Sequence, residues 1–297
     1  MKNKKIIKDF LSYLENERKF SPHTLRGYKI DLCNFNQFLK VNNFKQNFID
    51  ISKNDLQTYI QFLSKKKFST KTILRRIASI KSLYKFLSFK GFLSKNIASL
   101  IVSPKAMKKI PNYLSEKEVD KLMSLPDLST FKGAMHKSIL EVFYSTGLRI
   151  SELVKIKIVN IDYQNNTIKI LGKGNKERIV ILGNEAVGSI KNYLRVSKNS
   201  HNIYLYPSSH KVNSHLSESY VYKMVKYYLK KVTNNEKMSP HSLRHSFATH
   251  LLNKGADLMS VRELLGHEDL SSTQIYTHIS KEKLKRIYKK THPHGEN

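Results

Sequence analysis

Residues 239–252 read SPHSLRHSFATHLL, and this stretch predicts a helix with one apolar and one cationic face. Ser239 before Pro240 is typical of a helix start, because Ser caps free N–H groups and Pro fits the first turn. Three apolar residues recur at helical spacing and predict the core face: Leu243, Phe247 and Leu251. His241 and Arg244 are three residues apart and share the other face. Because a helix N-terminus favours an anion, these two side chains predict an anion site.

A metal site on the same helix is a weaker interpretation. His241 and His245 have the spacing of a zinc-binding helix, and His250 follows them. However, Ser242 stands where the H-E-x-x-H pattern needs Glu, and Arg244 would repel a cation. We therefore expect no catalytic metal and no cofactor.

The stretch LLGHEDLSSTQIYTH, residues 264–278, holds two further polar candidates. Gly266 is a typical residue for the end of a helix, which leaves His267 just beyond it. Tyr276 follows nine residues later, and as one of 16 tyrosines it fits a structural role equally well.

An arginine lies in a predicted turn upstream, in the stretch TGLRISEL, residues 146–153. Gly147 is expected to end one helix, and Ser151 can cap the next, which puts Arg149 between the two helices. Taken alone, Arg149 fits an ordinary surface or capping position.

A lysine lies in a second turn, in the stretch GKGNKER, residues 172–178. Glycines on both sides let Lys173 project from a tight hairpin. The two predicted strands of this hairpin are Thr167–Leu171 and Arg178–Leu182. Taken alone, this motif fits a solvated hairpin tip.

The chain is predicted to fold as two domains. Residues 1–100 predict four amphipathic helices joined by short loops, which make a small bundle. Helix starts carry cap signals at Ser21-Pro22, at Ser52 with Asp55, and at Ser69. Residues 101–114, with two prolines and several lysines, are typical of a linker. Residues 115–297 begin at a second capping box and are mainly helical around the hairpin, so the fold class is mainly α with a small β-sheet.

The charge of the chain indicates a polyanionic partner. Lys and Arg number 53 against 23 Asp and Glu, a formal net charge of +30 at pH 7. No acidic residue lies between Asp55 and Glu116, and a lysine-rich composition alone would not remove every carboxylate there. We therefore predict a face that contacts phosphates, either of nucleic acid or of another anionic surface. Its candidate residues are Lys65, Lys66, Lys67, Lys71, Arg75, Arg76 and Lys81.

The single cysteine, Cys33, excludes an intrachain disulfide framework and a cysteine-based zinc cluster. No apolar run approaches the length of a transmembrane helix, and the first twenty residues lack the cleavage site of a signal peptide. We expect a cytoplasmic protein with no membrane partner.

The four motifs in this order resemble the tyrosine recombinase (phage integrase-like) family, and specifically its Xer-type site-specific recombinases. Each motif alone is weak, but all four at Xer-like spacing are specific, and the similarity covers nearly the whole chain. The departures, at residues 271–273 and in the His-Pro-His-Gly tail, do not touch the chemistry. The resemblance implies an N-terminal SAM-like core-binding domain and an α+β catalytic domain that form a C-shaped clamp around DNA.

The resemblance also implies the reaction, which is DNA strand cleavage and religation through a 3′-phosphotyrosyl intermediate without metal or ATP. Six residues match the catalytic set of the family: Arg149, Lys173, His241, Arg244, His267 and Tyr276. In that set Tyr276 is the nucleophile, and the arginines and histidines stabilise charge on the phosphate. Lys173 is the general acid, with Lys176 as a competing candidate, and His241 is the base by analogy.

The resemblance further implies partners and a biological role. Xer-type enzymes work as four protomers on two duplexes, homomeric or with a sister recombinase, and often answer to a DNA translocase. Residues 281–297 are expected to form a helix that docks into a neighbouring protomer through Leu284 and Ile287. The expected role is the resolution of chromosome or plasmid dimers during cell division. Three alternatives stay open: a phage or mobile-element integrase, a type IB topoisomerase, and a DNA-binding protein of this fold without cleavage.

Overall fold

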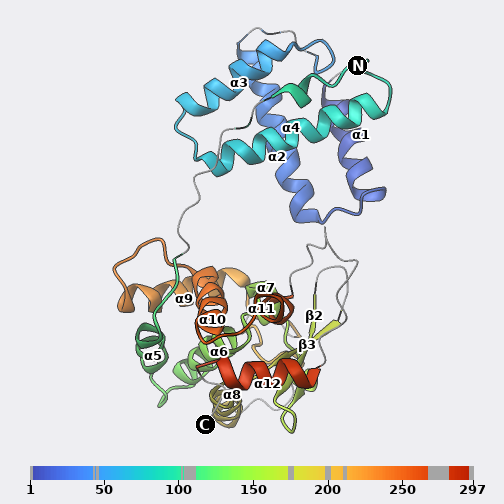
Figure 1. Cartoon of the computed structure of the whole chain (residues 1–297). Coiled ribbons are helices and arrows are strands. Elements are labelled where there is room, and N and C mark those ends of the chain that lie inside the picture. Colours follow the sequence, from blue (N-terminus) through green and yellow to red (C-terminus); the bar gives the residue numbers. More distant parts are fainter. Residues whose placement is uncertain are drawn as a thin grey trace. The chain divides into compact units, whose positions relative to one another are not determined.

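Helices dominate the chain, and they fall into two compact units, residues 1–109 and 110–297 (Figure 1). The computed structural model describes residues 3–42, 44, 47–101, 103, 112–172, 177–197, 202–209, 213–266 and 281–293. The predicted fold class, mainly helical with a small sheet, is confirmed. None of the helices in these ranges is long and apolar enough to cross a bilayer.

The N-terminal unit contains the four predicted helices, α1 (Asn3–Asn16), α2 (Pro22–Val41), α3 (Lys53–Lys65) and α4 (Thr70–Phe89), and then a 3-10 turn, η1 (Ile97–Leu100). The predicted caps Ser21, Ser52 and Ser69 each accept a hydrogen bond from the backbone N–H three residues ahead. All four helices bury their apolar faces in one core. Within it, the Tyr84 hydroxyl donates to the Phe48 carbonyl at 2.7 Å, so the phenol is satisfied although it is buried.

The C-terminal unit combines helices with a short sheet. Its helices are α5 (Glu116–Ser124), α6 (Phe131–Thr146), α7 (Ile150–Leu153), α8 (Asn184–Val196), α9 (Glu218–Val232), α10 (Pro240–Asn253), α11 (Leu258–Leu265) and α12 (Lys281–Thr291), with a 3-10 turn, η2 (Ile158–Asn160). Helix α6 is buried along most of its length and forms the centre of the core. The predicted core face of α10 is confirmed, since Leu243, Phe247 and Leu251 are all buried.

The sheet has three antiparallel strands in the order β1 (Ile161–Asp162), β2 (Thr167–Leu171) and β3 (Glu177–Ile181). The predicted hairpin is therefore present, although β3 starts one residue earlier than expected because Glu177 pairs with Leu171. The two-residue strand β1 was not predicted, since such a short run carries no period of its own.

Both ends of the predicted linker are packed against a unit. Ile101 is buried in the N-terminal core, and its carbonyl accepts a hydrogen bond from Lys81 Nζ at 2.9 Å. Leu114 is fully buried in the C-terminal unit, and its N–H donates to Ser246 Oγ on α10 at 2.8 Å. Residues 104–111, between them, lie outside the described residues.

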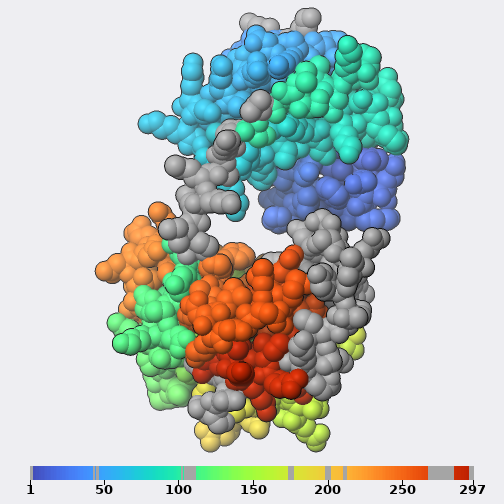
Figure 2. Space-filling view, viewed as in Figure 1, coloured from blue at the N-terminus to red at the C-terminus, as the bar shows by residue number. Residues whose placement is uncertain are grey.

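The C-terminal helix α12 packs on α10 and α11 of its own chain (Figures 1 and 2). Tyr288 is buried there with Phe247 and Leu264, and its hydroxyl lies 2.7 Å from Ser145 Oγ. Leu284 and Ile287 pack at the edge of the same cluster. This intramolecular packing differs from the expectation that the apolar edge of this helix docks into a neighbouring protomer.

Candidate functional site

Arg244 lies inside the C-terminal unit, where it binds backbone carbonyls. Its side chain is only 9% exposed. Nη1 donates to the carbonyl of Gly147, and Nη2 donates to the carbonyl of Leu265 at 2.8 Å. Gly147 ends α6 and Leu265 is the last residue of α11, so the guanidinium bridges the C-terminal ends of two helices. Those ends carry partial negative charge, which stabilises the buried cation.

Arg244 forms no ion pair with any carboxylate in the described part of the chain. Burial, together with the nearby charge of Arg149, lowers the pKa of Arg244 to about 10, whereas Glu152 raises it. The group therefore stays cationic at neutral pH. A buried cation held only by carbonyl dipoles keeps its full charge, so an anion that entered beside it would be strongly favoured.

Arg149 and Arg178 share one buried carboxylate, that of Glu152. Arg178 donates from Nη1 to Oε1 and from Nη2 to Oε2, both at 2.9 Å. Arg149 donates from its backbone N–H to Oε2 at 2.9 Å and from Nη1 to Oε1 at 3.0 Å. Burial alone would raise the pKa of Glu152, but hydrogen bonds and charge from Arg178 and Arg149 outweigh it and lower that pKa. Two guanidinium groups against one carboxylate leave the cluster net positive.

Two glycines allow this arrangement. Gly147 and Gly266 both have left-handed backbones, with φ of 57° and 64°, and end α6 and α11. A Cβ on Gly266 would lie 2.8 Å from Arg178 Cζ, so the guanidinium rests against the glycine backbone. A Cβ on Gly147 would lie 2.7 Å from the Phe247 ring. The missing side chain therefore lets Gly266 lie against Arg178 and lets Gly147 pack against Phe247.

The prediction that Ser151 caps the helix after Arg149 is wrong. The N-cap of α7 is Arg149 itself, and Glu152 at the third position of the helix accepts its backbone N–H. Glu152 thus caps the N-terminus of its own helix, and its carboxylate also binds the Arg149 side chain.

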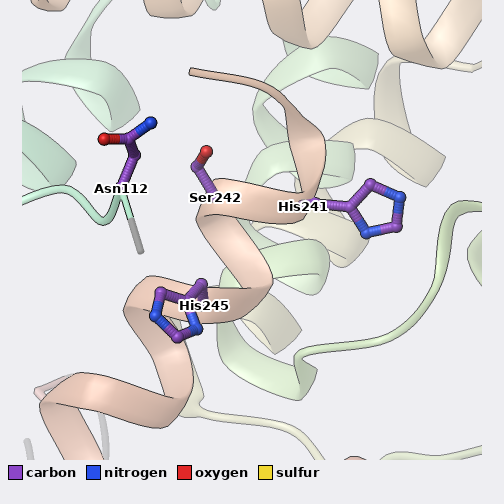
Figure 3. Close-up of a pocket in the computed structure, with 4 residues that line it drawn as sticks. All are labelled: Asn112, His241, Ser242 and His245. Atoms are coloured by element: carbon purple, nitrogen blue, oxygen red, sulfur yellow. The ribbon is translucent and has the colours of Figure 1, made fainter. Parts of the chain in front are cut away.

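His241 stands at the exposed start of α10, whereas Arg244 is buried one turn later. His241 lines an open pocket of about 300 Å³ together with Asn112, Ser242 and His245. Figure 3 shows the rings of His241 and His245 leaving α10 in different directions. His241 is therefore accessible to a ligand that reaches the N-terminal end of this helix.

The remaining catalytic candidates, Lys173, His267 and Tyr276, lie outside the described residues, as does Lys176. The structure does describe the residues that flank these segments in the chain. An ion pair of 2.6 Å between Lys169 Nζ and Glu177 Oε2 joins the two strands below the Lys173 turn.

Glu152 and Arg178 were not predicted as functional residues, although both stand in the quoted motifs. The spacing of Arg149 and Glu152, which is i, i+3 after a helix-ending glycine, was an available signal. Arg178 was marked only by being one of 10 arginines in a chain whose basic residues are mostly lysine. Its partner is 26 residues away, so no local pattern points to it.

The predicted phosphate-contacting residues of the N-terminal unit differ in their surroundings. Four of the five lysines among them are exposed, namely Lys65, Lys66, Lys67 and Lys71. Arg75 is half exposed and pairs with Asp31. The guanidinium of Arg76 stacks over the Phe68 ring, with its Cζ 4.3 Å from the ring centroid, and its side chain is 12% exposed. Arg76 and Lys81, which binds the Ile101 carbonyl, are thus both engaged inside the unit.

Two family models match the chain. The model of the phage integrase family matches residues 112–283, and that of the N-terminal SAM-like domain of phage integrases matches residues 7–91. These matches cover the two units on which the predicted SAM-like and catalytic domains fall.

Curated relatives match along nearly their whole length. The chain is 37% identical over 294 residues to Tyrosine recombinase XerD of Listeria innocua, covering 97% of this chain and 98% of the relative. It is 35% identical over 292 residues to Tyrosine recombinase XerD of Staphylococcus saprophyticus, with the same coverage.

A solved structure of XerH site-specific recombinase bound to difH substrate, a pre-cleavage complex, has a similar fold. Its TM-score is 0.69 at 24% identity, over 94% of this chain and 83% of that chain. The predicted resemblance is confirmed by the family models, by the relatives and by the fold together: the chain belongs to the phage integrase family, the tyrosine recombinases.

Proposed function

We propose that this protein is a Xer-type site-specific recombinase that cuts and rejoins DNA strands through a phosphotyrosyl intermediate. The observation that carries the proposal is Arg244, a buried cation without a carboxylate partner among the described residues, beside the net positive cluster of Arg149, Glu152 and Arg178. A phosphodiester is the anion that this group of cations would take, because two planar guanidinium groups can donate to its non-bridging oxygens.

The reaction follows from the roles assigned to the six catalytic residues. The Tyr276 hydroxyl loses its proton, to His241 by analogy, and its oxygen attacks phosphorus. The bond from phosphorus to the 5′-oxygen breaks, and a 3′-phosphotyrosyl link forms. Arg149, Arg244, His241 and His267 stabilise the charge that grows on the non-bridging oxygens. Lys173 gives a proton to the leaving 5′-oxygen.

The reverse step rejoins the strands. A 5′-hydroxyl from the exchanged strand attacks the phosphotyrosyl link and releases Tyr276, so the energy of the original bond is kept in the intermediate. The chemistry therefore needs no ATP.

The biological role that we infer is the resolution of chromosome or plasmid dimers, in the cytoplasm, during cell division. Whole-length relatives named XerD support this role over that of a mobile-element integrase. We further propose a synapse of four protomers on two duplexes, with the two units of each protomer around the DNA, and activation by a DNA translocase.

The experiment that tests the chemistry is covalent trapping on a nicked suicide duplex that carries a candidate recombination site. A protein–DNA adduct on a denaturing gel is expected for the wild type and is expected to vanish in Tyr276→Phe. Tyr222→Phe is a matched control, because Tyr222 is an exposed tyrosine on α9. An adduct that survives Tyr276→Phe would contradict the assigned nucleophile, and DNA binding without any adduct would favour a binding protein of this fold.

A further inference from the structure

A buried carboxylate lies beneath the basic face of the N-terminal unit. Asp31 on α2 is 1% exposed. Three side chains of α4 surround it: Arg75 Nη1 donates to Oδ2, Ser79 Oγ donates to Oδ2 at 2.9 Å, and Arg76 Nε lies 3.9 Å from Oδ1. Carboxylates are rarely buried unless they are paired, so these partners account for its position.

The side chain of Arg75 is fixed at Nη1 and is otherwise partly exposed to solvent. Its side chain is 51% exposed although Nη1 is fixed on Asp31. On α2, one turn before Asp31, stands Gly27, and a Cβ placed there would lie 4.0 Å from Arg75 Nη1. At that distance a Cβ would make only an ordinary contact with Nη1, so Gly27 leaves room beside this end of the guanidinium. The side-chain hydrogen bond described for Arg75 uses Nη1, so Asp31 orients the guanidinium from one end while half of the side chain stays exposed.

The face of α4 around Arg75 would allow a DNA groove to approach the helix closely. Lys71 is exposed one turn before Arg75, and Lys85 is exposed further along the same side. Between them the exposed residue next to Arg75 is Ala78, which has a short side chain. The major groove of DNA admits an α-helix, and a helix with two flanking lysines and a small residue beside its arginine fits that space.

The pairing with Asp31 makes Arg75 different from a residue that only contacts phosphate. A phosphate contact depends on net charge, and a carboxylate next to the guanidinium reduces that charge. What the carboxylate adds is orientation. An oriented, partly neutralised guanidinium suits the two neutral acceptors of guanine, O6 and N7, which take a bidentate arginine.

We propose that Arg75 is a specificity-determining residue that reads a guanine in the major groove of the recombination site, with Asp31 as its positioning residue. This inference rests on the proposed function, because it names how the same enzyme selects its DNA. The exposed lysines Lys65, Lys66, Lys67 and Lys71 would then supply affinity without sequence preference.

The test is a selection of bound duplexes from a randomised DNA library with the full-length protein. Wild type, Arg75→Lys, Arg75→Ala, Asp31→Asn and Lys71→Ala are compared at two salt concentrations. We expect both Arg75 variants to lose the preference for guanine at one position by roughly 5- to 150-fold, with the other positions unchanged. Asp31→Asn should weaken the same preference. Lys71→Ala should keep every preference and reduce the slope of log affinity against log salt by about one.

Arg75→Lys keeps the test valid if Arg75→Ala fails to fold, because lysine keeps the charge that pairs with Asp31 but cannot donate in the bidentate geometry. Variants of Arg75 that select the same bases as the wild type would overturn the inference and leave the proposed function standing. Variants of Arg75 that behave like Lys71→Ala would overturn it too, by making Arg75 a phosphate contact. A wild type that enriches no sequence would overturn both this inference and the site-specific part of the proposed function.

Discussion

Arg178 donates two parallel hydrogen bonds to Glu152, each 2.9 Å long, and this pair ties strand β3 to the start of α7. Glu152 also binds the side chain and the backbone of Arg149. The hairpin that bears Lys173 and the turn that bears Arg149 are therefore held through one carboxylate.

Removal of this carboxylate charge is expected to slow DNA cleavage and to destabilise the C-terminal unit. In Glu152→Gln, two cationic groups lose their anionic partner, and breaking a buried pair of this kind costs about 3–5 kcal/mol. Urea unfolding measures the loss of stability, and the rate of adduct formation on the suicide duplex measures the loss of catalysis.

A matched control is Lys169→Ala on the same hairpin. It breaks the ion pair with Glu177, in which both side chains are more than half exposed. Such a pair contributes less than about 1 kcal/mol. Equal effects of Glu152→Gln and Lys169→Ala would contradict the importance of the buried carboxylate.

Gly147→Ala is expected to destabilise the C-terminal unit by about 1–3 kcal/mol, because it combines backbone strain with overpacking. The φ of Gly147 is 57°, and the added Cβ would lie 2.7 Å from Phe247 Cδ1 and 2.8 Å from Leu265 Cδ2. Thermal unfolding measures the effect. Gly188→Ala on α8 is the control, since nothing lies within 4 Å of its Cβ, and it should be neutral or stabilising. The prediction fails if both variants unfold at the wild-type temperature.

Acid is expected to destabilise the protein through His136. Its two ring nitrogens lie 3.0 Å from Tyr228 Oη and 2.8 Å from Tyr220 Oη, and burial, with some help from Lys132, lowers its pKa from 6.5 to about 4. The unfolded chain therefore binds more protons than the folded one between these two pKa values. This contribution to stability is complete above pH 6.5 and is lost as the pH falls towards 4.

The size of this acid effect has an upper limit of about 3 kcal/mol. Unfolding free energies measured across that pH range should fall more steeply in the wild type than in His136→Gln, which keeps polar atoms near both tyrosines but does not titrate. Parallel pH profiles for the two proteins would rule out His136 as the source.

Truncation after Ser280 is expected to destabilise the C-terminal unit, beyond any effect on the synapse. It removes Tyr288, which is 2% exposed, and His292, which stacks on Tyr288 with ring centroids 4.6 Å apart. Loss of one large buried aromatic typically costs about 3–5 kcal/mol. Truncation after Pro293 retains α12 and serves as the control. If the shorter chain unfolded at the wild-type temperature, α12 would not be anchored in its own unit.

Lys173→Arg is expected to retain DNA binding and to slow cleavage, because arginine keeps the charge but does not readily release a proton. Adduct formation and gel-shift affinity, measured side by side, separate the two effects. Lys176→Arg is the control, and slow cleavage in Lys176→Arg with normal cleavage in Lys173→Arg would move the general-acid role to Lys176.

Local signals in the sequence predicted the helices well. The caps at Ser21, Ser52, Ser69 and Ser115 lie within three residues of the groups they bind, so one turn of chain contains the whole interaction. The strand boundaries of the hairpin were predicted to within one residue, because its turn is also a local interaction. The cap of α7 was assigned wrongly because Ser151 is a common capping residue and Arg149 is not, and only the folded turn shows that Glu152 binds the Arg149 backbone.

The sequence by itself determined the family, the two-unit helical plan and the motifs that hold Arg149, His241 and Arg244, because each of these depends on residues close together in the chain. Tertiary structure decided which partners these side chains meet. The carbonyls that hold Arg244 come from helix ends 97 and 21 residues away, and Arg178 reaches Glu152 across 26 residues. No local pattern encodes such contacts, since they exist only when packing of the core brings the ends of α6 and α11 beside α10.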